Sequence, residues 1–373
     1  MLRILGSKKT LCDGLTRRDL LRAGGLGVLG LGLADFLQLR DVRAEAPAVR
    51  CFGRAKSCIL LYLYGAPSQL ETFDMKPDAP AGIRGDLEPI ASSLPGLDVC
   101  ELLPNTARVM DRVTVVRSVT HAYPIHGVAY ALSGVPAIDV PMELNPSDPR
   151  HWPFFGSVVD YLGRRNRAQP ARPGVPQNVG LPFAFSSHRV GEVPRAGPYA
   201  AFLGPQYNPV WMDFRGEGTR GVVRTLQDKK EEFRDPYLGL SSDSHFVLPS
   251  GSALPPEVTL DRLNRRRSLL EQFDGARREL GRSVAGRSLD RYQQMAFAMI
   301  DSQQVGRALD VRMEESDVRE SYGMTLFGQA CLAARRLVEA GTRLVSVFWD
   351  EFGLAGTGWD THWDHYPRMK NEL

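Results

Sequence analysis

Apolar residues gather in three short runs that predict the strands of a sheet. CILLYLY, residues 58–64, is apolar throughout and is bounded by polar and turn residues, a pattern typical of a strand buried on both faces. The β-branched run VTVVRSV, residues 113–119, predicts a second inner strand. RLVSVFW, residues 343–349, predicts a third buried strand.

A helix is expected directly before the third run. The pattern of residues 324–340 is helical, and Gly341 follows as a residue that readily takes the left-handed conformation at a helix end. Helix, glycine and strand in this order form half of a βαβ repeat. The sequence therefore predicts an α/β fold with a mostly parallel central sheet.

Two other segments predict helices, and one long region predicts loops. A short helix is expected around residues 102–110. Residues 259–310 place leucines near one face and arginines on the other, so the basic run 265–267 is interpreted as a solvated helix face. From about residue 141 to 256, Pro, Gly, Asn and Ser recur between short apolar runs, which predicts a loop-rich insertion or cap.

Residues 1–46 have the features of an export signal. The paired Arg17 and Arg18 precede a Gly-rich apolar run, residues 23–39, and the small-residue site Ala44-Glu45-Ala46 follows. This pattern resembles a twin-arginine signal, which implies the twin-arginine export machinery as a partner and a periplasmic or extracellular location, including the cell surface. The alternative is a weak anchor that stays uncleaved, because the apolar run is at the short limit for a membrane span. The remaining domain would be residues 47–373, with no stable membrane span after cleavage.

Composition and charge narrow the classes of function. Hydrophobic residues make up 43% and charged residues 24% of the chain, which is ordinary for a globular protein. The net charge of +3 comes from the predicted signal, because residues 47–373 hold 38 Lys and Arg against 38 Asp and Glu. Since no basic patch with interleaved aromatic residues is apparent, we expect no nucleic-acid partner.

Polar residues follow each predicted strand, where ligands collect in open parallel sheets. Glu71 and Asp74 follow the first, as carboxylates that hold a divalent cation or cap a helix. His121 and His126 follow the second, as metal ligands or structural histidines. Thr120 beside them is a candidate nucleophile if a metal or base activates its hydroxyl.

The third strand end carries the densest polar cluster. Asp360, His362, Asp364 and His365 offer both oxygen and nitrogen donors. Extended chain puts positions 360 and 362 on one side, whereas a helix pairs 360 with 364 and 362 with 365, so either conformation produces a chelating pair. The alternative is an aromatic and polar surface loop.

Three stretches carry a resemblance to a known family: FGRAKSCILLYLYGAPSQLETFDMKPDAP, VRSVTHAYPIHGVAYALSG and GTRLVSVFWDEFGLAGTGWDTH. In this order they resemble domain-of-unknown-function family 1501, which is abundant in planctomycete-type bacteria and is placed in the alkaline phosphatase and sulfatase superfamily. The resemblance implies an alkaline-phosphatase-like α/β/α fold, and a metal-dependent hydrolase acting on phosphate or sulfate esters, either small esters or a sulfated glycan. It also implies a divalent metal, Zn, Ca or Mn.

The resemblance also suggests roles for particular residues. Glu71 and Asp74 would be ligands after the first strand, Asp360 and His362 the later Asp/His pair, and residues 120–134 the region of the nucleophile. This loop departs from the sulfatase pattern, since PIHGVAY stands where a Cys or Ser followed by Pro-x-Arg is expected. Thr120 and Ser133 therefore remain candidates only.

A second departure concerns the end of the chain. The family pattern continues past the Trp-Asp-Thr-His motif through further elements, so the resemblance predicts a fold that lacks its C-terminal part, and inactivity through truncation is one outcome that it leaves open for this chain. Two alternatives to a hydrolase remain open: a non-catalytic periplasmic or cell-surface binding protein, and a non-functional gene fragment.

Overall fold

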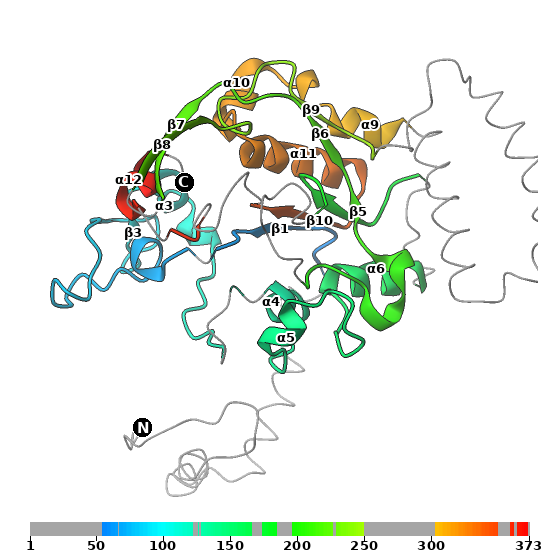
Figure 1. Ribbon diagram of the computed structural model, residues 1–373, viewed down its shortest axis with the longest axis horizontal. Helices are drawn as coiled ribbons and strands as arrows, with labels where there is room; N and C mark the ends of the chain where they lie inside the picture. The colour runs from blue at the N-terminus through cyan, green and yellow to red at the C-terminus, as the bar shows by residue number, and fades with distance from the viewer. Residues whose placement is uncertain are drawn as a thin grey trace, which may run out of the picture. The chain divides into compact units, whose positions relative to one another are not determined.

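The computed structural model describes residues 54–65, 67–121, 126, 128–165, 174–184, 196–226, 229–249, 303–349, 359–361 and 364–371 (Figure 1). The chain divides into two units, Met1–Lys56 and Ser57–Leu373, and the fold described here is that of the second. The predicted signal, residues 1–46, lies outside the described residues. In the described part of the chain, no helix is both long and apolar enough to cross a membrane.

A four-stranded parallel sheet forms the centre of the second unit. Its strands run in the order β1 (Cys58–Tyr62), β10 (Leu344–Phe348), β4 (Asn178–Leu181) and β5 (Val210–Trp211). Cys58 lies opposite Leu344, which in turn lies opposite Asn178. The predicted α/β class with a mostly parallel sheet is confirmed, as are the strands expected within residues 58–64 and 343–349.

Helix α11 (Leu326–Ala340) covers one face of this sheet (Figure 1). The Thr325 side chain accepts the Gly328 N–H at its start, and Gly341, at φ 112°, ends it in the left-handed conformation. Apolar side chains of α11 pack with Val345 and Val347 of β10 in the main core cluster. The predicted order of helix, glycine and strand is confirmed.

The opposite face of β10 packs against a second core cluster. Leu344 and Phe348 contact Val128 and Leu132 of α4 (Val128–Ser133) and Phe154, which precedes α6 (Phe155–Arg165). Because successive side chains of a strand point to opposite faces, alternate residues of β10 pack into the two clusters. All five residues of β10 are buried.

Strand β1 differs from the expectation that it is buried on both faces. It lies at the edge of the described sheet, and the side chains of Ile59 and Leu61 are 38% and 50% exposed. Leu60 and Tyr62 pack against the second core cluster. One face of β1 is therefore shielded, whereas the face with Ile59 and Leu61, which is the α11 side of the sheet, is only partly covered at this edge.

The prediction of a second inner strand at residues 113–119 is wrong. These residues form neither strand nor helix, and Val116 and Val119 are 63% and 76% exposed. Val115 alone of this run packs against a small cluster around Val99 and Met110. A β-branched sequence forms a strand only where a neighbouring strand pairs with it and an apolar layer covers it. This tertiary context overrides the strand propensity of the residues.

Two strands missed by the sequence analysis, β4 and β5, come from the region expected to be a loop-rich insertion or cap. Their short apolar runs join the central sheet beside β10. The helix expected around residues 102–110 is confirmed by α3 (Pro104–Ala107). Most of the helix expected over residues 259–310 lies outside the described residues, and α9 (Gln304–Leu309) stands at its end.

The other described elements are short. They are η1 (Gln69–Glu71), the antiparallel pairs β2 (Pro89–Ile90) with β3 (Val99–Cys100), β6 (Asp213–Arg215) with β9 (His245–Val247) and β7 (Gly221–Leu226) with β8 (Lys229–Arg234), and η2 (Met110–Arg112), α5 (Val140–Glu143), η3 (Ala201–Leu203), η4 (Pro205–Tyr207), η6 (Val311–Met313), α10 (Ser316–Tyr322) and α12 (His365–Asn371).

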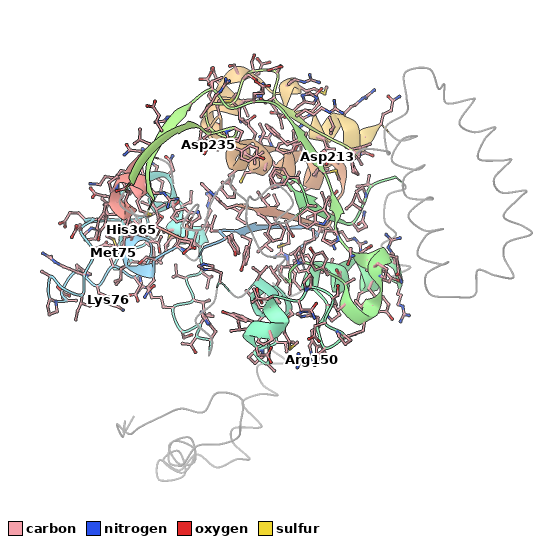
Figure 2. The ribbon with its side chains drawn as sticks, in the orientation of Figure 1. Met75, Lys76, Arg150, Asp213, Asp235 and His365 are labelled. Atoms are coloured by element: carbon pink, nitrogen blue, oxygen red, sulfur yellow. The ribbon has the colours of Figure 1, made fainter. Side chains whose placement is uncertain are left out.

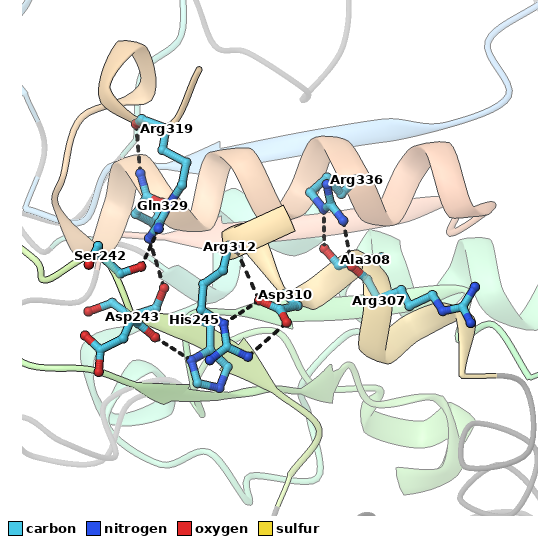
Figure 3. A network of polar contacts seen from close by, with 11 residues as sticks. Ser242, Asp243, His245, Arg307, Ala308, Asp310, Arg312, Arg319, Gln329 and Arg336 are labelled. Carbon is cyan, nitrogen blue, oxygen red and sulfur yellow. Dashed lines mark hydrogen bonds and ion pairs between the residues drawn. The ribbon is translucent and has the colours of Figure 1, made fainter. Parts of the chain in front are cut away.

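A buried polar network ties α11 to the segments packed over it (Figure 3). The guanidinium of Arg319, which is 6% exposed, donates to Gln329 Oε1 at 3.1 Å and to the carbonyl oxygens of Ser242 and Ser244. Gln329 is fully buried and donates back to the Arg319 carbonyl at 2.9 Å. Nearby, Arg336 donates to the Ala308 carbonyl at 3.0 Å. These bonds satisfy polar groups that are expensive to bury alone.

We expect Arg319→Ala to lower the free energy of unfolding by about 3 kcal/mol, because it leaves the buried Gln329 side chain and the buried Ser244 carbonyl without their donor. The measurement is urea denaturation. Arg312→Ala is the control, since its side chain is 43% exposed in the ion pair with Asp310 and its loss should cost less than about 1 kcal/mol. Equal effects of the two substitutions would contradict the role given to Arg319.

Candidate functional site

The carboxyl ends of β1 and β10 lie side by side. The backbone around Asp360 packs against the chain just after β1. Gly65, three residues after β1, has φ 105°, a left-handed conformation that favours glycine. A Cβ atom at Gly65 would lie 2.2 Å from the Asp360 nitrogen and 2.7 Å from the Trp359 carbonyl carbon. Glycine is therefore required here for both its conformation and the close approach of the two backbones.

His126 and Asp360 form the central pair of the site. The distance from His126 Nε2 to Asp360 Oδ2 is 3.2 Å, and the side chains are 26% and 20% exposed. The His126 ring packs against Tyr64, with ring centroids 5.3 Å apart, and the Tyr62 hydroxyl donates to the His126 carbonyl at 3.2 Å. The end of β1 thus supports His126 from two sides, and solvent still reaches the pair.

Glu143 fixes the segment that follows His126. Its carboxylate is 1% exposed and accepts the Val128 N–H at 2.7 Å and the Ala129 N–H at 3.1 Å, the first two amides of α4. A negative charge is favourable at this end of a helix. Burial, and then the charge of Glu143, raise the pKa of Tyr62, so its hydroxyl stays protonated. The sequence analysis missed Glu143, because nothing local links it to residues fifteen positions earlier.

A second polar cluster surrounds Glu71, the last residue of η1. Glu71 is 5% exposed, and its carboxylate accepts from the Tyr366 hydroxyl at 3.4 Å and lies 3.8 Å from His365 Nε2. His365 Nδ1 is in turn 2.6 Å from the Thr361 hydroxyl. Figure 2 shows His365 beside the segment that carries Met75, a residue of the small core cluster against which Tyr366 packs. Burial raises the pKa of Tyr366, as do the charges of Glu71 and Asp86.

The two clusters meet at consecutive residues, since Asp360 belongs to the first and Thr361 to the second. The structure thus brings together His126 with Asp360, and Glu71 with His365, from segments far apart in sequence. Within the described ranges, no group of three or more His, Cys, Asp and Glu side chains is arranged to hold one metal ion.

Several predicted site residues lie apart from these clusters. Asp74 binds Lys76 at 2.7 Å, which lowers the pKa of the carboxyl group, and lies 3.8 Å from Arg117. The His121 ring packs on Tyr130 with centroids 5.1 Å apart. The Ser133 hydroxyl accepts the Val135 N–H at 3.3 Å in a local turn.

The remaining candidates are less informative. Thr120 is exposed, at the end of the run that forms no strand. Asp364 precedes α12 with φ 50°, and its carbonyl accepts the Arg368 N–H at 2.9 Å. His362 lies outside the described residues.

A family model described as Protein of unknown function (DUF1501) matches residues 55–373. The chain belongs to this family. No curated protein and no solved structure matches it. The DUF1501 match includes every residue of both polar clusters, so the site lies wholly inside the family domain.

Gly65→Ala should lower the free energy of unfolding by about 2–4 kcal/mol, because the new methyl group strains the left-handed backbone and also meets the Asp360 nitrogen. The control is Gly134→Ala, where φ is 72° but no atom lies within 4 Å of the added Cβ. Only the conformational cost, about 1–2 kcal/mol, is expected there. Urea denaturation measures both, and an equal loss would show that the close approach at Gly65 is unimportant.

Glu143→Ala should lower the free energy of unfolding by about 2–3 kcal/mol, because two buried amides lose a charged acceptor. Hydrogen exchange should also become faster at the Val128 and Ala129 amides. Glu339→Ala is the matched control, because that carboxylate is 63% exposed and pairs only with Arg335 among the described residues. Unchanged exchange at the start of α4 would contradict the capping role.

Proposed function

We propose that this DUF1501 protein is an exported, metal-dependent hydrolase of phosphate or sulfate esters, with an alkaline-phosphatase-like α/β/α fold. The observation that carries the proposal is the 3.2 Å pair of His126 and Asp360 beside the carboxyl end of β1, where the Asp360 backbone approaches Gly65 and the His126 ring packs on Tyr64. Ligands of open parallel sheets collect at this edge. The twin-arginine pattern at Arg17 and Arg18 supports a periplasmic or cell-surface location.

The donor chemistry at this pair fits a divalent cation. An imidazole nitrogen and a carboxylate oxygen suit Zn or Mn better than Ca, which prefers oxygen ligands throughout. His126 and Asp360 would hold the ion, and two protein donors leave other coordination positions to water and substrate. When bound, such a cation acts as a Lewis acid that polarises the ester oxygen.

The surrounding residues orient this pair. Tyr64 packs on the His126 ring, the Tyr62 hydroxyl holds the His126 carbonyl, and the Glu143 carboxylate holds the backbone two residues later. Gly65 allows the Asp360 backbone to approach β1. A site held from this many directions keeps its two donors in place before a ligand binds, which reduces the entropic cost of binding.

A non-catalytic binding protein is the second candidate. It is favoured by the segment PIHGVAY, residues 124–130, which contains no Ser, Thr or Cys where the superfamily resemblance would place a nucleophile. The same metal site on this scaffold would then bind an ester or glycan without cleaving it.

Metal analysis together with turnover of p-nitrophenyl phosphate and p-nitrophenyl sulfate tests the proposal. We expect one or more equivalents of bound Zn or Mn, turnover that is abolished by a chelator, and losses of about 100-fold or more in kcat/KM for His126→Ala and Asp360→Asn. Bound metal without turnover supports the binding protein instead.

His245→Ala is the matched control for these variants. His245 is a partly exposed histidine of β9 whose ring lies 2.7 Å from the Asp243 carbonyl, in the network of Figure 3. Its substitution should change neither the metal content nor the turnover. Metal content that is equal in His126→Ala, Asp360→Asn and the unaltered protein would refute the metal site.

A further inference from the structure

A cavity of about 760 Å³ lies between the loop that follows α5 and the segment around η3 and η4. It is lined by aromatic, proline and a few polar side chains, and those that matter below are Ser147, Asp148, Trp152, Tyr199, Phe202 and Asn208. None of its lining residues belongs to the His126 and Asp360 pair or to the Glu71 cluster. Its volume is that of a pocket for a small organic ligand.

Two large aromatic side chains of this cavity are unusually exposed. Trp152 is 54% and Phe202 is 66% exposed, and their rings meet edge to face with centroids 5.7 Å apart. Leaving this much aromatic surface in water costs free energy that burial against a ligand would recover. The pair therefore marks a surface suited to stacking on a flat, partly apolar group.

The walls that carry these rings are held by hydrogen bonds. The Phe154 N–H donates to the Tyr199 carbonyl at 2.9 Å, and the Ala200 N–H donates to Asn208 Oδ1 at 2.6 Å. His151 Nε2 lies 2.8 Å from the Asn145 carbonyl and 3.1 Å from that of Met142, which fixes the turn before Trp152. The cavity is thus formed in advance, and binding would require little reordering.

The charged groups at the cavity are already paired and offer no attraction to an anion. Asp148 accepts from Arg150 Nε at 3.0 Å and from Nη2 at 2.7 Å, and these bonds lower the pKa of its carboxyl group to about 2. Arg150, labelled in Figure 2, uses its guanidinium in this pair. Among the described residues that line the cavity, none is Lys or Arg. An anionic ligand would therefore find no cation among these lining residues, and the nearby Arg150 is already paired with Asp148.

A purely apolar ligand also fits poorly. It would cover the polar groups of Ser147 and Asn208 and remove them from water without replacing their bonds to water, and it would place the Asp148–Arg150 ion pair against an apolar surface. The cavity requires a ligand that has an apolar face for the rings and hydroxyl groups for these acceptors and donors. Sugar rings combine both properties, because their C–H groups form an apolar face and their hydroxyls project around the edge.

We propose that this cavity binds a neutral carbohydrate, which stacks on Trp152 and Phe202 and directs hydroxyl groups toward Ser147, Asp148 and Asn208. The site is independent of the proposed hydrolase function. Its binding would hold the protein on a glycan surface whether or not the His126 and Asp360 pair catalyses a reaction.

Calorimetric titration of the full chain with cellotetraose, maltotetraose, xylotetraose and mannotetraose tests the proposal. We expect saturable binding of at least one of them, weakened about tenfold by Trp152→Ala and by Phe202→Ala. Met313→Ala, which removes an apolar side chain that is 62% exposed on η6, is the control and should bind as the unaltered protein does. Circular dichroism verifies that each variant is folded.

Two results would overturn the proposal. One is the absence of saturable binding for all four tetrasaccharides. The other is binding that is equal in Trp152→Ala, Phe202→Ala and the control, which would place the sugar elsewhere. Saturable binding of the uncharged apolar dye N-phenyl-1-naphthylamine alone, lost in Trp152→Ala, would identify an apolar pocket and likewise refute the carbohydrate. Metal content measured on the same variants should be unchanged, so this test and that of the hydrolase can fail separately.

Discussion

The pairing of β10 with a strand on each side is the interaction on which the described fold depends. Its five residues are fully enclosed, with β1 and β4 at its edges, α11 on one face and α4 with the residues before α6 on the other. Parallel pairing sets the register of β1 and β10, so both strands end at the same edge of the sheet. Gly65 lies just beyond this end of β1, where the Asp360 backbone approaches it and the Asp360 side chain meets His126.

The elements that the sequence predicts well are those whose signal is local. α11 has a capping threonine, a helical pattern and a terminal glycine, and β10 follows as a continuous apolar run, so both were predictable. The run at residues 113–119 carries an equally clear local signal but lacks a neighbouring strand, and propensity cannot supply one. β4 is only four residues long and contains a glycine, so tertiary contacts rather than its own sequence define it as a strand.

The candidate site shows the same division. The sequence places polar residues after the strands, but it cannot tell which of them meet, because that depends on the path of the chain between them. Asp74 is captured by its neighbours Lys76 and Arg117, whereas Glu71, three residues before it, is buried against Tyr366. Glu143 supports the site from α5 and has no local pattern at all. Geometry therefore selects among candidates that composition treats as equivalent.

The position of β1 also has a consequence for how the molecule is made. Within the described sheet, its partner is β10, so β1 can pair only after the chain has been synthesised as far as Leu344, which lies opposite Cys58. β4 and β5 are closer in the chain and can associate earlier. Contacts between such distant segments slow folding, because the entropy cost of closing a long loop comes before the strand hydrogen bonds that offset it. During synthesis the apolar run of β1 leaves the ribosome early and stays without its partner strand until most of the chain has followed, which makes this segment a natural target for a chaperone.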